Sequence, residues 1–159
     1  MKKLKLYIET SAWNFFFADD APEKRDSTKE FFATIERGVY ELFISNIMLI
    51  EIDKAPEEHR KLLMDLIGRC KPSEIQVTNA MQLLAEKYIQ RKIVPAKKLE
   101  DALHVAIATV AELDAVITWN YRHLANLRKS ELFYNVNLEE GYSKKIELIT
   151  PLEVIDDEV

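Results

Sequence analysis

The stretch LKLYIE, residues 4–9, decides the fold class because it is typical of a β-strand that ends on an acidic residue. Leu4, Leu6 and Ile8 recur at every second position, which is the period of a strand with one buried face. Thr10 or Ser11, directly afterwards, is of the residue type that caps a helix. The opening of the chain therefore predicts a strand, then a short helix, with Glu9 at the carboxyl end of the strand.

The alternation of strands and helices continues along the chain. Ser27 and Glu30 have the spacing of a capping box, and the helix that follows is expected to end near residue 37, before Gly38. Pro56 suits the first turn of a later helix and Gly68 suits its C-terminal end. We expect further strands at 40–45, 75–77, 115–118 and 146–149, helices at 46–52, from 79 and at 97–113, and a turn with a short helix over 120–127.

Strands that alternate with helices and lack hairpin turns predict an α/β fold. We expect a three-layer α/β/α sandwich with a central, mainly parallel sheet. The length of 159 residues and the 48% apolar content fit one domain, for which we expect residues 1–155, followed by an acidic tail at 156–159.

Composition excludes several classes of protein. The one cysteine, Cys70, has no partner for an internal disulfide, and the chain has no signal-peptide pattern and no run near the ~20 apolar residues of a membrane span. These features predict a cytoplasmic protein with no membrane association. Gly38, Gly68 and Gly141 lie too far apart for a dinucleotide fingerprint or a P-loop, so no nucleotide cofactor is expected.

Charge is unevenly distributed along the chain. The formal net charge is −5, and residues 139–159 account for all of it, so the remainder is neutral. Basic residues cluster on either side of the most apolar predicted helix, as Lys87, Arg91, Lys92, Lys97 and Lys98 and as Arg122, Arg128 and Lys129. These clusters either contact phosphates or form an ordinary solvated face, and the sequence leaves both interpretations open.

Four oxygen-bearing side chains stand where a parallel fold would bring them together. Glu9 ends the first strand, Glu51 lies within the apolar run IMLIEI, Asp101 opens the most apolar helix, and Asn120 follows the strand at 115–118. Each has an ordinary alternative: helix-start acids for Glu9 and Asp101, a salt bridge to Arg or Lys for Glu51, and a turn residue for Asn120. Together, converging carboxylates favour a hard cation such as Mg²⁺ or Mn²⁺.

At these positions the sequence resembles the PIN (PilT N-terminus) domain nucleases, which include the VapC-like toxins. The resemblance covers nearly the whole chain and rests on the following stretches: YIETS at 7–11, FISNIMLIEI at 43–52, EDALHVAIA at 100–108, VITWNYRHL at 116–124 and IELITPLEVI at 146–155. Where the family usually has aspartate, this chain has Glu9, which could ligate a metal at a shifted position, and Asn120, whose missing charge predicts weaker binding of a second metal and reduced activity.

The resemblance implies roles for individual residues. Glu9, Glu51 and Asp101 would ligate the metal, and Asn120 would orient metal-bound water or a phosphate oxygen. The supporting shell would be Thr10, Ser11 and Thr118. The residues expected to contact RNA are Lys97, Lys98, Arg122 and His123.

The function implied by the resemblance is that of a PIN-like nuclease: a Mg²⁺- or Mn²⁺-dependent endoribonuclease, a hydrolase of RNA phosphodiester bonds. It would be the toxin of a toxin–antitoxin pair, with an antitoxin protein as partner and a homodimer as assembly. The alternative is a catalytically degraded PIN-fold protein that binds RNA or a protein partner without cleavage. His104 is expected to be a core or cap histidine rather than a ligand, and the aromatic residues Trp13 and Phe15–Phe17 to be core or dimer face rather than a base-stacking surface.

Overall fold

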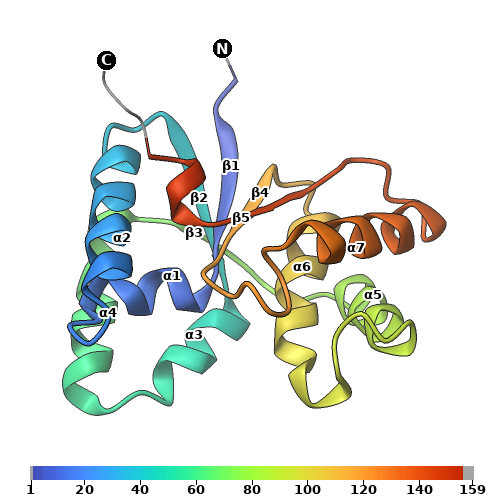
Figure 1. The fold of residues 1–159 in the computed structure, drawn as a ribbon, viewed down its shortest axis with the longest axis horizontal. Coiled ribbons are helices and arrows are strands. Elements are labelled where there is room, and N and C mark those ends of the chain that lie inside the picture. The colour runs from blue at the N-terminus through green and yellow to red at the C-terminus, as the bar shows by residue number, and fades with distance from the viewer. Residues whose placement is uncertain (1, 156–159) are drawn as a thin grey trace.

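The computed structural model describes residues 2–155 and places one β-sheet between two layers of helices (Figure 1). The strands are β1 (Leu4–Ile8), β2 (Tyr40–Ser45), β3 (Ser73–Ile75), β4 (Ala115–Ile117) and β5 (Glu147–Ile149). The α-helices are α1 (Thr10–Asn14), α2 (Pro22–Ile35), α3 (Asn46–Asp53), α4 (Glu57–Cys70), α5 (Asn79–Gln90), α6 (Leu99–Val110) and α7 (Leu127–Glu139). Short 3-10 segments lie at Phe15–Phe17, Ala96–Lys98 and Pro151–Glu153.

The sheet has the order β3-β2-β1-β4-β5, and each neighbouring pair is parallel. The predicted α/β sandwich is confirmed, and the sheet among the described residues is entirely parallel rather than mainly so. The chain runs outward from β1 to β3 on one side and then returns to form β4 and β5 on the other. Strand order therefore reverses between β1 and β4, and the carboxyl ends of these two strands flank the crevice where open α/β sheets bind ligands.

The two faces of the sheet carry separate apolar cores, because successive side chains of a strand point to opposite faces. On β1, Leu6 and Ile8 pack with α1 to α4, whereas Tyr7 packs with α5, α6 and α7. In Figure 1 these helix groups lie on either side of the sheet. Trp13 is fully buried in the first group and its indole N–H donates to the Ile8 carbonyl, so it is a core residue as expected.

Two predicted helix ends are wrong. The helix α2 begins at Pro22, five residues before Ser27, because proline is accommodated in a first turn where its missing N–H is not needed. Gly68 lies inside α4 rather than at its end, and the stop is Lys71, whose φ of 51° puts it in the left-handed region.

Other predicted boundaries moved by a few residues. The strand β3 lies at 73–75 rather than 75–77, since its partner β2 turns into α3 after Ser45. Thr78 rather than Asn79 caps α5, and Glu9 rather than Thr10 or Ser11 caps α1. The segment expected to be one helix over 97–113 divides into the 3-10 turn at Ala96–Lys98 and α6.

The helix α7 was not predicted, and the short helix expected over 120–127 is a series of turns. Asn126 caps α7 by accepting a hydrogen bond from the Lys129 N–H, and Phe133 and Val136 bury its inner face. Among residues 2–155, no helix is long and apolar enough to cross a membrane. The predicted acidic tail at 156–159 lies outside the described residues.

Candidate active site

Glu9 occupies the switch point between β1 and β4. Its side chain is only 4% exposed, and its two carboxyl oxygens accept hydrogen bonds from the Ser11 backbone N–H at 2.7 Å and from the Thr118 hydroxyl at 2.8 Å. Burial raises the pKa of Glu9 above its ordinary value, although His104, Ser11 and Thr118 oppose the shift by favouring the charged form. The helix-start role considered for this acid is therefore confirmed: Glu9 is the N-cap of α1.

Glu51 pairs with a buried histidine, and not with the arginine or lysine that was one of the alternatives considered for it. His104 Nε2 lies 2.5 Å from Glu51 Oε1, and Nδ1 lies 2.6 Å from the Tyr7 hydroxyl, which in turn lies 2.7 Å from the Ser45 hydroxyl. Ser45 also caps α3 by accepting from the Met48 N–H. These contacts form one continuous polar chain, from the α3 N-cap through β1 and α6 back to α3.

The charge on His104 is set by two opposing effects. Burial disfavours the imidazolium, but the hydrogen bond and charge of Glu51, together with Glu9 and Asp101, more than offset it and raise the pKa of His104. When the ring is protonated, both nitrogens donate, one to Glu51 and one to the Tyr7 oxygen. Tyr7 then donates to Ser45, and burial raises the pKa of Tyr7 far above its ordinary value, so it stays neutral.

Asp101 and Asn120 meet across the crevice. Asn120 Nδ2 donates to Asp101 Oδ2 at 3.3 Å, and Asn120 Oδ1 accepts from the His123 N–H at 3.0 Å. Burial raises the pKa of Asp101, opposed by the positive charges of His104, His123 and Lys98. The amide of Asn120 thus turns its N–H toward Asp101, where an aspartate would present a second negative charge. The turn role considered for Asn120 is present as well.

Two of the three residues expected in the supporting shell, Ser11 and Thr118, make hydrogen bonds beside Glu9. Thr118 donates to Glu9 and accepts from the Asn120 N–H, while the Ser11 hydroxyl accepts from the Trp119 N–H at 2.9 Å and lies 3.3 Å from Thr118 Oγ1. Thr10 departs from the expectation because its hydroxyl is buried and has no hydrogen-bond partner in the part of the chain described.

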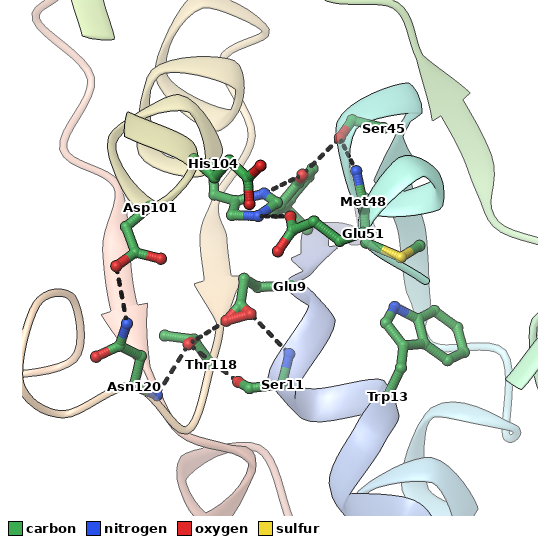
Figure 2. Close-up of polar contacts among 12 residues, drawn as sticks. Glu9, Ser11, Trp13, Ser45, Met48, Glu51, Asp101, His104, Thr118 and Asn120 are labelled. Carbon is green, nitrogen blue, oxygen red and sulfur yellow. Dashed lines mark hydrogen bonds and ion pairs between the residues drawn. The ribbon is translucent and has the colours of Figure 1, made fainter. Parts of the chain in front are cut away.

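The three carboxylates lie around one space but turn toward different partners. Figure 2 shows Glu9 directed at Ser11 and Thr118, Glu51 at His104, and Asp101 at Asn120. Within residues 2–155, no three His, Cys, Asp or Glu side chains form a group that could hold a metal ion. Ligation of one ion by Glu9, Glu51 and Asp101 therefore stays a prediction, and the observed arrangement is a hydrogen-bonded one.

The residues expected to contact RNA divide into two groups. Lys97 and Lys98 are exposed on the 3-10 turn before α6, and the charge of Lys98 acts on Asp101 and His123. Arg122 and His123 lie in the turn after Asn120 and line a pocket with Lys92 and Lys129. One residue of each group, Lys98 and His123, is close enough for its charge to act on Asp101.

Tyr7, Ser45 and His104 are the site residues that the sequence did not single out as functional. A signal existed in the spacing: Tyr7 faces away from Leu6 and Ile8 on its strand, and His104 follows Asp101 by three residues, hence on a neighbouring part of the same helix face.

No protein-family model matches the chain, and no curated protein matches its sequence.

Proposed function

We propose that the protein is a metal-dependent endoribonuclease of the PIN-like type. The observation that carries the proposal is the placement of Glu9, Glu51, Asp101 and Asn120 at the carboxyl edge of the sheet, beside the switch point. The charges of all three carboxylates act on the single buried imidazole of His104. Acids that cluster at a switch point, two of them with a pKa raised by burial (Glu9 and Asp101), are typical of a catalytic centre.

The donor set suits a hard divalent cation. It offers carboxylate and amide oxygens, which Mg²⁺ and Mn²⁺ prefer, and burial raises the pKa of Glu9 and Asp101, a shift that a bound cation would reverse. Glu9, Glu51 and Asp101 would hold the ion. When bound, it would activate water and offset charge on a phosphodiester oxygen.

The protein's own residues orient these acids. Ser11 and Thr118 fix both oxygens of Glu9, His104 fixes Glu51, and Asn120 fixes Asp101. Hydrogen bonds of this kind limit the movement of a carboxylate and set the direction in which its remaining lone pairs point. The cationic side chains beside Asp101 would attract the phosphates of a substrate.

Titration of Mn²⁺ into metal-free protein by calorimetry tests the proposal without a guess about the RNA sequence. We expect binding by the wild type, loss of that binding in Asp101→Asn and Glu51→Gln, and parallel loss of Mn²⁺-dependent cleavage of mixed RNA. The matched control is Glu100→Gln, which removes the neighbouring acid, an exposed residue paired with Lys54. Cleavage that survives both site substitutions would overturn the proposal.

One observation favours a second function, that of a PIN-fold protein that binds RNA or a protein partner without cutting. Asn120 is neutral and is engaged on both sides, by Asp101 and by the His123 backbone. RNA binding that persists in EDTA, with no cleavage in Mn²⁺ across several RNA pools, would favour this alternative over the enzyme.

The proposed partners come from the same family resemblance. They are an antitoxin protein that would block the crevice and a second copy of the chain in a homodimer. Sedimentation at several protein concentrations tests the homodimer, and growth arrest on expression of the wild type but not of Asp101→Asn tests the toxin role.

A further inference from the structure

A basic pocket adjoins the candidate active site and is not explained by the carboxylates. Its volume of ≈ 560 Å³ is in the range of small-ligand sites, and it is bounded by residues 92–96 on one side and by Arg122, His123 and Lys129 on the other. It shares the turn after Asn120 with the active site, since the His123 backbone donates to Asn120 Oδ1.

The lining of this pocket is one-sided in charge. Lys92, Arg122 and Lys129 contribute positive charge, and no acidic side chain is among the described residues that line it. The negative net charge of the chain comes from residues 139–159, and none of these residues lines the pocket. The rest of the lining is an apolar wall formed by Ile89, Ile93 and residues 94–96, on the same side as Lys92, and a wall of low dielectric strengthens the attraction of an anion.

Backbone contacts hold the Lys129 ammonium and the main chain at Lys92 in place. Lys92 has a φ of 60°, a left-handed conformation that follows the end of α5, and its N–H donates to the Ile89 carbonyl. The Lys129 ammonium donates to the Ile93 carbonyl, which fixes it at the rim. Lys129 also belongs to the first turn of α7, whose N-cap is Asn126. The fold therefore fixes one cation of the pocket, Lys129, and the main chain that carries a second, Lys92.

We propose that this pocket binds one nucleotide of a single-stranded RNA, adjacent to the bond at the candidate active site. The phosphate would lie against Arg122, Lys92 and Lys129, and the sugar and base would lie against the apolar wall. The proposal rests on the proposed ribonuclease function, and it adds Lys92 and Lys129 to the RNA contacts expected from sequence. A nucleotide suits a pocket that combines cationic side chains with apolar ones.

The test measures RNA binding without metal, so that it does not depend on cleavage. A short, fluorescein-labelled single-stranded RNA of mixed sequence is titrated with protein in EDTA, and anisotropy gives the Kd at several salt concentrations. For Arg122→Gln and for Lys92→Asn, we expect a Kd about fivefold or more weaker. The slope of log K against log salt should also be smaller, by about 0.7 for each phosphate that the variant no longer neutralises. Asparagine tolerates the left-handed conformation at position 92.

The matched controls lie at the opposite, amino edge of the sheet. Lys71→Asn makes the same change at another left-handed lysine, and Arg69→Gln removes an exposed arginine paired with Glu36. Neither control is expected to change the Kd. Melting curves of all four variants show that each is folded before its Kd is compared.

The outcomes separate this proposal from the ribonuclease proposal. If RNA binding depends on Arg122 and Lys92 but the protein cuts no RNA, the pocket proposal is supported and the ribonuclease proposal is overturned. If the protein cleaves RNA but its pocket variants bind RNA as tightly as the control variants do, the ribonuclease proposal is supported and the pocket proposal is overturned. Absence of RNA binding in EDTA, or displacement by inorganic phosphate as readily as by unlabelled RNA, also overturns the pocket.

Discussion

His104 is the residue on which the polar centre of the molecule depends. It is 1% exposed, and it is the hydrogen-bond partner of both Glu51 and Tyr7. In His104→Ala, both groups lose this partner and a cavity is left, so we expect the free energy of unfolding to fall by about 3 kcal/mol.

Chemical denaturation at pH 7 measures this loss. His59→Ala is the matched control: His59 is half-buried, and its ring nitrogen contacts only the Asn14 side chain among the described hydrogen bonds, so we expect a loss of less than about 1 kcal/mol. Equal and small losses in the two variants would contradict the central role of His104.

Asp114 predicts a pH dependence at the amino edge of the sheet. Burial opposes its charge, but the Lys5 N–H at 2.7 Å and the Lys144 ammonium at 2.9 Å outweigh burial and lower the pKa of Asp114. A carboxyl whose pKa is lowered on folding stabilises the protein above its unfolded pKa, and this contribution is lost as the pH falls through the folded pKa.

We therefore expect Asp114→Asn to destabilise the protein by about 1 kcal/mol at pH 7 and to match the wild type in strong acid. Urea denaturation over a range of pH measures the difference. The exposed Asp65→Asn on α4 is expected to change stability by less than about 0.5 kcal/mol throughout. If the stability difference between the wild type and Asp114→Asn grew as the pH fell, the prediction would be contradicted.

At the scale of elements, two glycines should respond in opposite directions to the same change. Gly68 lies within α4 with nothing near the position of an added Cβ, whereas Gly38 follows α2 with a φ of +77°. Alanine favours a helix over glycine, so Gly68→Ala should stabilise by about 0.5 to 1 kcal/mol. Gly38→Ala should destabilise by about 1 kcal/mol because of its left-handed backbone. Thermal melting compares the two, and a loss of stability in Gly68→Ala would contradict the helix-interior placement.

The elements that sequence predicted well are those with a strong local signal. The strands β1 and β2 and the Ser45 cap of α3 match, because alternation and a cap residue act over a few neighbouring positions. Gly68 was misleading because a glycine marks a helix end only when the backbone there is left-handed, and Lys71 took that conformation instead. The helix α7 was missed although Asn126 and the apolar Phe133 and Val136 have helical spacing.

The site was predictable in position and not in its contacts. Parallel strands place Glu9 and Asn120 at one edge whatever their side chains do, so their approach follows from topology. The partner of each acid depends on rotamers and on distant elements: His104, on α6, reaches Glu51 on α3, 53 positions away. The local spacing of residues in the sequence gives no information about a contact between two such distant positions.

At the scale of the whole molecule, the two cores share one sheet and should unfold together. Phe133 is 2% exposed on the α5–α7 side and stacks edge-on against Tyr88, so Phe133→Ala should cost about 3–5 kcal/mol. Trp13 packs on the opposite face, and the Trp119 indole N–H donates to Thr28 of α2. Tryptophan fluorescence and circular dichroism are expected to report the same shifted transition.

The control for this variant is Leu127→Ala at the start of the same helix. Leu127 is 81% exposed, so we expect a change within about 0.5 kcal/mol. Two separated transitions in Phe133→Ala, with the tryptophan signal unshifted, would show that the faces unfold independently.

The strand order has a consequence for how the protein is made. The central strand β1 is synthesised first, but its neighbour β4 comes much later: Glu9 and Thr118, which join the ends of these strands, are 109 positions apart. One edge of β1 therefore stays unpaired on the ribosome until β4 has emerged, and closing so long a loop slows folding. The candidate active site, which needs both strands, is assembled only after β4 has been synthesised.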